Sequence, residues 1–307
     1  CPPAVSVIVF GSANIDLVMP VLAVPVPGET VLTESYLAVP GGKGANQALA
    51  ARRAGAKVSF AGAVGQDTHG ESALSLLRAE GVDLDAVRIS DRPTGCAVVM
   101  VDPNGENSIV VASGANLSVT ASQVSDALLD EAELLVLQQE IPLEENLQLA
   151  IRASRKGLRV VFNLAPARDV PDDLLESVDM LVVNEVEAAF LAGGHSVEDM
   201  SALADALAGR HDFGVVITLG SDGAVVAPGG NAGSFSVKAP QVNVTDTTGA
   251  GDTFTGYLAA RLAQGNLVLE RCISEAICAA SLACTKAGAQ AGIPYSSEVS
   301  KSTSFRA

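Results

Sequence analysis

The sequence predicts an α/β fold with a mostly parallel central sheet, helices on both faces of that sheet, and a small additional β-sheet. The first observation is that short apolar runs rich in β-branched residues alternate along the chain with longer helical patterns. Parallel strands covered on both faces are apolar over their whole length, so this alternation indicates a three-layer αβα sandwich. The second observation is that two segments, 13–40 and 94–113, are β-rich and break the alternation.

Six apolar runs predict strands of the central sheet, at 5–10, 58–64, 134–137, 160–162, 180–183 and 215–219. Helical periodicity predicts helices near 44–54, 69–80, 121–130, 143–156, 185–192, 198–209, 250–264 and 269–286. With 307 residues, of which 48% are hydrophobic, the chain can fill one large core, and we expect a single domain over 1–307.

The two β-rich segments predict the additional sheet. The first contains "TVLTESYLAV", and the second reads as a hairpin, "TGCAVVMV" and "NSIVVAS", around the turn "DPNGE". We expect 13–40 and 94–113 to pair into a lid over the α/β body, where it would exclude water. The alternative is that both segments are edge strands of the central sheet. The exposed edge of a small sheet invites pairing with a second copy, so we also expect a homodimer through the lid.

The composition excludes some classes of partner. A formal net charge of -16 disfavours nucleic acid and anionic membranes, because both need a basic surface. No apolar run approaches the about 18 residues that a membrane span needs, and no signal peptide is expected before the first strand. The five cysteines lack CxxC spacing, which favours reduced thiols and a cytoplasmic location over disulfides or zinc.

Polar residues follow the apolar runs where strands are expected to end. The carboxyl ends of parallel strands share one edge of an open sheet, which is where ligands bind. Each polar residue is ordinary for a loop, and it is their number that favours a binding edge. They occur at 65–67, 138–140, Asn163, Asn184 and 220–221.

Two stretches in the first 50 residues suit a polar ligand. In "GSANID", Asn14 and Asp16 lie two apart, so on an extended chain they face one way and suit neighbouring hydroxyl groups; an Asx-type turn is the alternative. In "GGKGANQA", residues 41–48, glycines allow backbone amides near a ligand at a helix start, and Asn46 can point to the same ligand. The spacing fits neither a Walker A loop nor GxGxxG.

For two later stretches, the sequence is consistent with either a structural role or a role in binding. In "NEVE", Asn184 and Glu187 fit a capping box, and the alternative is that Glu187 holds water around Mg²⁺. "TLGSDGAVV", residues 218–226, is either a simple hairpin or a glycine turn that approaches a flat ring or a phosphate.

The stretch "TDTTGAGDTF", residues 245–254, combines an anion site with a carboxylate. Gly249, Ala250 and Gly251 place free amides at a helix N-terminus, and the helix dipole stabilises ionised Asp252 in the first turn. A capped helix start is the alternative, but a cap needs no flanking glycines. This arrangement suits deprotonation of an alcohol that attacks a phosphoryl group.

"GGKGANQA" and "DTTGAGDTF", in this order and about 200 residues apart, resemble the two signatures of the ribokinase-like (PfkB-type) carbohydrate kinases. The resemblance extends from "GSANID" to "KAGAQAGIP", and "PGET", "FNLAPA" and "NEVE" are similar to the members that phosphorylate ribose. It implies an α/β sandwich with a β-clasp lid and transfer of the ATP γ-phosphate to O5 of D-ribose.

The resemblance also implies roles for individual residues. Asp252 would be the catalytic base, with Gly249, Ala250 and Gly251 as the anion hole. The sugar would be bound by Asn14, Asp16, Gly42, Lys43, Asn46 and Glu140, together with Asp252. ATP and its hydrated Mg²⁺ would be bound by Asn184, Glu187, Thr218, Gly220, Ser221, Gly223 and Gly251.

A monovalent-cation site beside the anion hole is implied as well, and a K⁺-sized ion held there by carbonyl groups would order the loop that carries Asp252. Members of the family often have serine where this chain has Gly292, and Asn or His where it has Ile277 in the adenine pocket. The implied K⁺ ligands are Asp246, Thr248, Ala283, Lys286, Gly288 and the position of Gly292.

Other functions stay open at this point. A related kinase for deoxyribose, fructose or a nucleoside is the first alternative, although 4% aromatic residues and no Trp favour a small sugar. A non-catalytic sugar sensor on the same fold is the second, and an intact Asp252 stretch speaks against it. A dinucleotide-dependent oxidoreductase would need GxGxxG after the first strand, where the chain reads "FGSANID".

Overall fold

An eight-stranded sheet forms the centre of the molecule. The computed structural model describes residues 5–103, 107–194, 198–211, 213–230 and 232–302. Neighbouring strands from β4 to β12 pair in parallel, and β13 and β14 add an antiparallel edge, which confirms the mostly parallel sheet. In spatial order the strands are β14 (Phe235–Val237), β13 (Ala224–Ala227), β12 (Gly214–Thr218), β11 (Met180–Asn184), β10 (Arg159–Asn163), β9 (Leu134–Leu137), β1 (Ser6–Phe10) and β4 (Lys57–Ala61).

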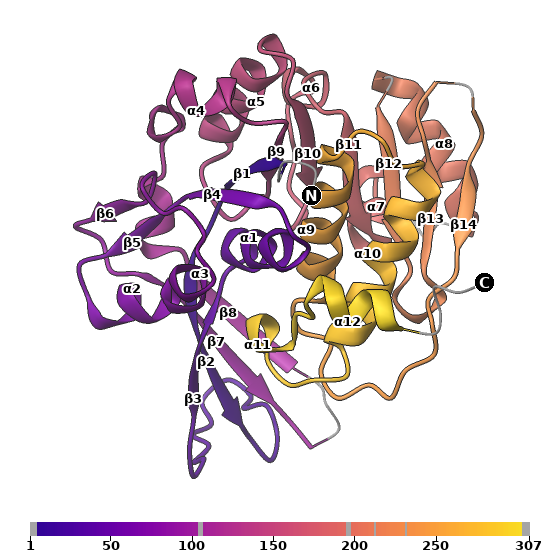
Figure 1. Ribbon diagram of the computed structural model, residues 1–307. Coiled ribbons are helices and arrows are strands. Elements are labelled where there is room, and N and C mark those ends of the chain that lie inside the picture. Colours follow the sequence, from indigo (N-terminus) through magenta and orange to yellow (C-terminus); the bar gives the residue numbers. More distant parts are fainter. Residues whose placement is uncertain (1–4, 104–106, 195–197, 212, 231, 303–307) are drawn as a thin grey trace.

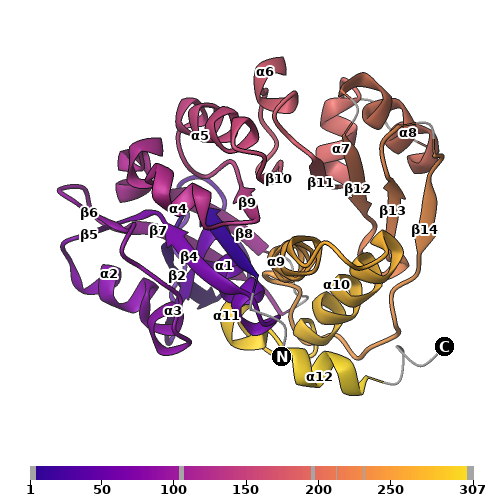
Figure 2. The ribbon, with the colours of Figure 1, turned by 45° about the horizontal axis from the view of Figure 1, so that its top comes forward.

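Helices cover both faces of this sheet (Figures 1 and 2). One face carries α1 (Lys43–Arg53), α2 (Thr68–Ala73), α3 (Ser75–Ala79), α9 (Ala250–Ala263), α10 (Leu269–Ala283) and α12 (Ser296–Lys301). The other carries α4 (Asp126–Asp130), α5 (Leu143–Arg155), α6 (Asp172–Leu175), α7 (Glu185–Leu191) and α8 (Met200–His211). The short α11 (Ala289–Gly292) lies between α10 and α12 in the chain.

The alternation along β1 shows why both faces are covered. Val7 and Val9 belong to the apolar core on the α1 side, whereas Ile8 and Phe10 belong to the core on the α5 side. All four side chains are fully buried. Successive strand residues point to opposite faces, so a strand that is apolar at every position requires a layer of helices on each side.

The two β-rich segments form a separate four-stranded sheet, which excludes edge strands of the central sheet. Its order is β3 (Leu37–Gly41), β2 (Asn14–Pro20), β7 (Gly95–Val101) and β8 (Asn107–Ala112). The pairing of β2 with β7 is parallel and joins 13–40 to 94–113, and the other two pairings are antiparallel. This sheet, called the clasp sheet below, extends away from the body at the bottom of Figure 1.

Some predicted elements differ in detail. The strand expected in "TVLTESYLAV" is wrong for 30–36, because these mostly exposed residues have no partner strand and only the last three residues enter β3. The helix near 69–80 divides at Leu74 into α2 and α3, and that near 121–130 becomes a 3₁₀ turn (Ala121–Gln123) followed by α4. The run 58–64 divides into β4 and β5 (Ala63–Gly65), and β5 pairs with β6 (Arg88–Ser90). Residues 104–106 of the predicted hairpin turn lie outside the described residues.

None of the helices within the described ranges has both the length and the apolar character that a bilayer span requires. The four cysteines in those ranges, Cys96, Cys272, Cys278 and Cys284, are unpaired thiols.

Candidate active site

Asp252 lies where the first turn of α9 meets α1, at the carboxyl edge of the central sheet. It is 7% exposed and accepts two hydrogen bonds, from Nδ2 of Asn46 at 2.8 Å and from Nε2 of Gln47 at 2.9 Å. Gln47 also donates to Oδ1 of Asn163, the last residue of β10, at 3.0 Å. Two amides of α1 therefore hold both carboxylate oxygens of Asp252.

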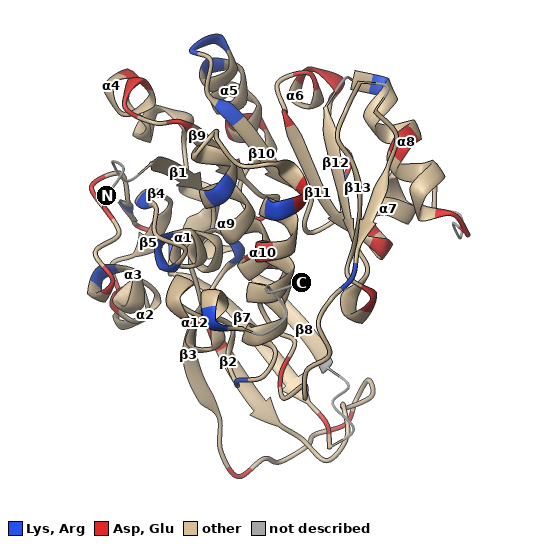
Figure 3. Ribbon diagram, turned by 45° about the vertical axis from the view of Figure 1, so that its right-hand side comes forward, with Lys and Arg blue, Asp and Glu red and all other residues tan. Residues whose placement is uncertain are grey.

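The charged cluster at this edge contains several carboxylates around one ammonium group, that of Lys43. Burial raises the pKa of Asp252, and the positive charge of Lys43 and the two amides oppose that rise. Burial also works against the charged form of Lys43, but the carboxylates of Asp252, Glu140, Glu187 and Asp16 outweigh it and raise its pKa. Figure 3 shows acidic and basic residues on many elements of the ribbon, so charge is not confined to this edge of the sheet. With more carboxylates than ammonium groups, the cluster suits a neutral ligand that donates hydroxyl hydrogens.

Asp16 is a half-buried acceptor without a donor. No donor in the described part of the chain hydrogen-bonds to its carboxylate, and burial, Glu140 and Asp252 raise its pKa to about 7. A Cβ at Gly41, on the neighbouring strand β3, would lie 2.1 Å from Oδ2 of Asp16. Glycine at 41 thus leaves the space that the carboxylate occupies, and the carboxylate keeps its lone pairs for a ligand.

Asn14 and Asp16 both lie in β2, so the alternative of an Asx turn is wrong. Asn14 is 2% exposed, and its Oδ1 accepts from Nδ2 of Asn116 at 2.7 Å. Oδ1 of Asn116 accepts from the amide of Ala13 at 3.0 Å. These bonds fix the orientation of the Asn14 amide and leave its NH₂ group to act as a donor.

Glu140, after β9, connects the turn at Ser12 to the start of α1. Its Oε2 accepts from Oγ of Ser12 at 2.6 Å and from the amide of Lys43 at 3.1 Å. Gly42 has φ 90°, and a Cβ there would lie 2.8 Å from the amide of Asn14. The glycine pair before α1 therefore packs directly on the β1–β2 turn, which brings together Asn14, Gly42, Lys43 and Glu140, four of the residues expected to bind the sugar.

The start of α9 is suited to an anion. Gly249 has φ 76°, in the left-handed region, and the amides of Gly251 and Asp252 donate no hydrogen bond to another described residue. Apart from its chain neighbours and its own helix, nothing lies within 4 Å of a Cβ placed on Gly251, so this residue at the start of α9 borders open space. Free amides at a helix N-terminus attract negative charge.

Asn184 and Glu187 form the capping box that was one of the two predicted roles. The amide of Asn184 donates to Oε2 of Glu187, and the amide of Glu187 donates to Oδ1 of Asn184, both at 2.8 Å. Glu187 is nevertheless buried, and burial raises its pKa, while Lys43 opposes this rise. Glu187 therefore caps α7 and also belongs to the charged cluster.

Within the described ranges, no group of three or more His, Cys, Asp or Glu side chains is placed to hold a metal ion. The buried carboxylate of Glu187 is an oxygen acceptor suited to a water of Mg²⁺, an ion that usually keeps several waters when it is bound near phosphates.

The turn 218–223 joins β12 to the antiparallel β13, as the hairpin interpretation predicts. Gly223 has φ 100°, and a Cβ there would lie 2.0 Å from the carbonyl oxygen of Val237, so only glycine fits this contact. Thr218 ends β12, at the same edge as Asn184, its register partner on β11.

A cavity of about 780 Å³ lies beside this turn, although none of the predicted sugar, phosphate or cation ligands lines it. Ile277, next to the lining residue Cys278 on α10, is 5% exposed and packs in the core. The lining residues are Val237, Lys238, Ala239, Pro240, Gln241, Val268, Glu270, Arg271, Ser274 and Cys278.

The predicted K⁺ ligands also lie together. Oδ1 of Asp246 accepts from the amide of Thr248 at 2.9 Å, and Oδ2 accepts from the amide of Gly288 at 2.8 Å. Although burial opposes it, these bonds lower the pKa of Asp246, which favours the carboxylate. A Cβ at Gly292 would lie 3.0 Å from the carbonyl oxygen of Ala283 and 3.5 Å from that of Lys286. Carbonyl oxygens beside a carboxylate form a donor set that fits K⁺.

Residues 5–295 match the description pfkB family carbohydrate kinase. The chain belongs to this family. It is 40% identical to a ribokinase of Haemophilus influenzae over 301 residues, covering 94% of this chain and 95% of that one. It is 37% identical to a ribokinase of Bacillus subtilis over 299 residues, with coverages of 96% and 98%.

Solved structures agree with this membership. The structure of Arabidopsis thaliana ribokinase complexed with ribose and ATP matches with a TM-score of 0.88 and 33% identity, over 97% of this chain and 98% of that one. Ribokinase from Thermotoga maritima matches with a TM-score of 0.88 and 29% identity, with coverages of 97% and 98%. The chain is a ribokinase-family phosphotransferase that acts on carbohydrate.

Within this family site, sequence reasoning missed the residues that orient the predicted ones: Gln47, Asn163, Ser12 and Asn116. Gln47 lay inside the quoted "GGKGANQA", and Ser12 inside "GSANID". Asn163 was named only as a strand end. Asn116 had no local signal, because its contacts with Ala13 and Asn14 join residues about 100 positions apart.

Proposed function

We propose that this kinase transfers the γ-phosphate of ATP to O5 of D-ribose, giving ribose 5-phosphate and ADP. The observation that carries the proposal is Asp252: a buried carboxylate, held by Asn46 and Gln47, beside free amides at the start of α9. The relatives named ribokinase, and the Arabidopsis complex with ribose and ATP, support ribose as the sugar.

In the proposed reaction Asp252 accepts the proton of the O5 hydroxyl as that oxygen attacks the γ-phosphorus. A bond forms between O5 and phosphorus, the bond from phosphorus to the bridging oxygen breaks, and ADP leaves with the electron pair. The amides of Gly249 and Gly251, which donate to no described residue, would hold the negative charge on the migrating phosphoryl group. The amide of Ala250 donates to the carbonyl oxygen of Thr247 at 3.2 Å and would have to leave it to join them. Because burial raises the pKa of Asp252, the carboxylate is a stronger base than an exposed one.

The sugar would lie between β2 and the start of α1. Asp16 accepts hydrogen bonds from two ring hydroxyls, and the free NH₂ of Asn14 donates to a third oxygen. Lys43 and Gly42 close the side formed by α1, and Glu140 accepts from a remaining hydroxyl. Asn46 bridges sugar and base, since it already holds Asp252 at 2.8 Å.

ATP would lie along the ends of β11 and β12, with Asn184 and Glu187 toward its phosphates. The turn of Thr218, Gly220, Ser221 and Gly223 would contact the nucleotide. Mg²⁺ neutralises phosphate charge when it is bound, and Glu187 would hold one of its waters. K⁺ would be held by Asp246, Thr248 and the carbonyls of Ala283, Lys286 and Gly288, and would order the loop that leads to Gly249.

The clasp sheet would act as a lid, and a second copy would pair with its exposed edge. Both edge strands expose apolar side chains: Leu37 is 65% exposed, Ile109 51% and Val110 64%. Exposed apolar edges invite strand pairing. Light scattering after size exclusion should show a dimer, and Val110→Lys should shift the protein to a monomer. A monomeric wild type would contradict the proposed dimer.

The unpaired thiols support a cytoplasmic location.

A coupled assay of ADP release tests the proposal, with ribose, deoxyribose, fructose and adenosine as acceptors, in K⁺ and in Na⁺ buffer. We expect the highest kcat/KM for ribose and a higher rate in K⁺. Preference for fructose or adenosine would move the chain to another branch of the family, and equal rates in both salts would count against the cation site.

A further inference from the structure

We propose that Arg53 is a positioning residue for phosphoryl transfer: it holds the α11 segment against Gly249 and so fixes the amides at the start of α9. This inference rests on the proposed function, because those amides are the anion hole of that reaction. Arg53 ends α1, about 15 Å along the helix from Lys43. It hydrogen-bonds to none of the residues proposed to bind sugar, nucleotide or cation, so we expect it to act through the segment that it holds.

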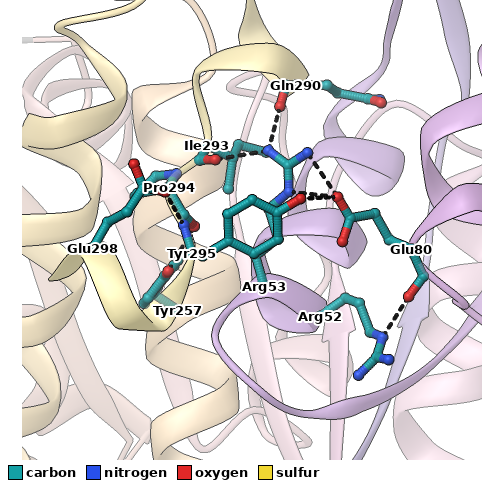
Figure 4. Close-up of polar contacts among 9 residues, drawn as sticks. All are labelled: Arg52, Arg53, Glu80, Tyr257, Gln290, Ile293, Pro294, Tyr295 and Glu298. Atoms are coloured by element: carbon teal, nitrogen blue, oxygen red, sulfur yellow. Dashed lines mark hydrogen bonds and ion pairs between the residues drawn. The ribbon is translucent and has the colours of Figure 1, made fainter. Parts of the chain in front are cut away.

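Arg53 binds the segment that follows the cation loop (Figure 4). Its Nη1 donates to the carbonyl oxygen of Gln290 at 3.0 Å and to that of Ile293 at 2.7 Å. Nε and Nη2 donate to Oε1 of Glu80 at 3.2 and 3.0 Å. The guanidinium lies 4.8 Å from the ring centroid of Tyr295, and the side chain is 7% exposed. A planar fork with several donors can serve these acceptors together, which an ammonium group cannot.

Other contacts brace the same segment. The hydroxyl of Tyr295 donates to Oε1 of Glu80 at 2.6 Å, so Glu80 receives hydrogen bonds from both Arg53 and Tyr295. From α9, the hydroxyl of the buried Tyr257 donates to the carbonyl oxygen of Pro294 at 2.7 Å. The segment is therefore fastened to α1 and to α9, the two helices that supply the proposed sugar and phosphate contacts.

The other end of the segment touches the anion hole. A Cβ placed on Gly249 would lie 2.9 Å from Cβ of Ala289, the first residue of α11, so Gly249 and Ala289 are in close contact. The amide of Gly288 donates to Asp246, on the loop before α9. α11 has four residues, too few for a helix to be stable by itself. Its position depends on these outside contacts, and a shift of α11 shifts the support of Gly249.

Arg52 provides a matched comparison on the same turn of α1. Its Nε donates to the carbonyl oxygen of Glu80 at 2.7 Å, and its Nη1 donates to that of Ala56 at 3.3 Å. Neither acceptor belongs to the 288–295 segment. If arginine here serves only to fasten the end of α1, replacing either residue will have the same consequences.

Hydrogen–deuterium exchange of Arg53→Lys and Arg52→Lys tests the inference without any need for turnover. We expect Arg53→Lys to speed exchange several-fold in peptides from 286–295 and from 245–256, and Arg52→Lys to leave both near wild type. Tyr295→Phe keeps the ring and removes one bond to Glu80, so it should give a smaller change in the same direction. Wild-type exchange over 245–256 in Arg53→Lys, or equal changes in the two Lys variants, would overturn the proposal.

Turnover gives the second readout. We expect Arg53→Lys to lower kcat roughly tenfold, because small displacements of a reacting group are costly. The KM for sugar should stay within about twofold, since Asn14 and Asp16 lie on β2, and Lys43 and Asn46 lie at the opposite end of α1 from Arg53. A raised KM with unchanged kcat would contradict the positioning role. If the wild type phosphorylates no sugar, the proposed function fails, while the exchange experiment still decides whether Arg53 controls the start of α9.

Discussion

Two carboxylates face the candidate site from different parts of the molecule and are held in different ways. Asp252, at the start of α9 in the body, is fixed on both oxygens by Asn46 and Gln47. Asp16, on β2 of the clasp sheet, receives no hydrogen bond from the described residues, and its pKa is about 7. The body thus presents a carboxylate that is already oriented, while the clasp sheet presents one that accepts no hydrogen bond from the described residues and can accept from a ligand. This difference suits a base and a binding group, respectively.

The largest effect is expected from Asp252→Asn. Loss of the base should lower kcat by about 10³-fold or more, because general-base catalysis and charge placement both depend on this carboxylate. Ribose binding, measured by calorimetry, should largely survive, since Asn14, Asp16 and Glu140 remain. Near-normal turnover in a correctly folded variant would remove Asp252 from the role of base.

Asp16→Asn should show the opposite division. A hydrogen bond to a charged group contributes about 1.5–3 kcal/mol, so the KM for ribose should rise roughly 10- to 100-fold, with a smaller change in kcat. Asp85→Asn, at an exposed carboxylate, is the matched control and should behave as wild type. A kcat loss as large as that of Asp252→Asn would erase the distinction between the two carboxylates.

Gln47→Leu sharpens the comparison by loosening the fixed carboxylate. The variant removes one donor from Asp252 and one from Asn163, so we expect kcat to fall roughly tenfold. That amide lowers the pKa of Asp252, so its removal should move the acid limb of the kcat/KM profile to higher pH. Gln148→Leu, at an exposed position on α5, serves as the control. An unshifted pH profile would mean that Gln47 only fills space.

Local patterns in the sequence predicted the parallel strands of the central sheet and the residues that we propose to face the ligand, but not the three-residue edge strand β14. Asn14, Asp16, Asn46 and Asp252 each lie in a stretch whose glycines, helix start or strand end carry a local signal. The roles of Gln47 and Asn116 are different, because they arise from contacts across 205 and 102 residues. Inside a helical pattern Gln47 looks like any polar residue. The sequence analysis also did not predict α11, because a helix of four residues is too short to show a helical period.

The smallest expected effect concerns stability and again separates the two carboxylates. The pKa of Asp16 rises from 3.8 in the unfolded chain to about 7 in the fold. Below pH 4 both states are protonated and ionisation has no cost; between pH 4 and 7 the unfolded state loses its proton first, and folding is progressively disfavoured. Above pH 7 the cost is full, because burial and the charges of Glu140 and Asp252 oppose the carboxylate. Asp16→Asn should therefore raise Tm by a few degrees at pH 8, and this gain should shrink toward pH 5. Differential scanning calorimetry of ligand-free protein, with Asp85→Asn as control, measures the gain. A gain that does not depend on pH would show that the fold does not raise the pKa of Asp16, so that Asp16 is already a carboxylate when a ligand arrives.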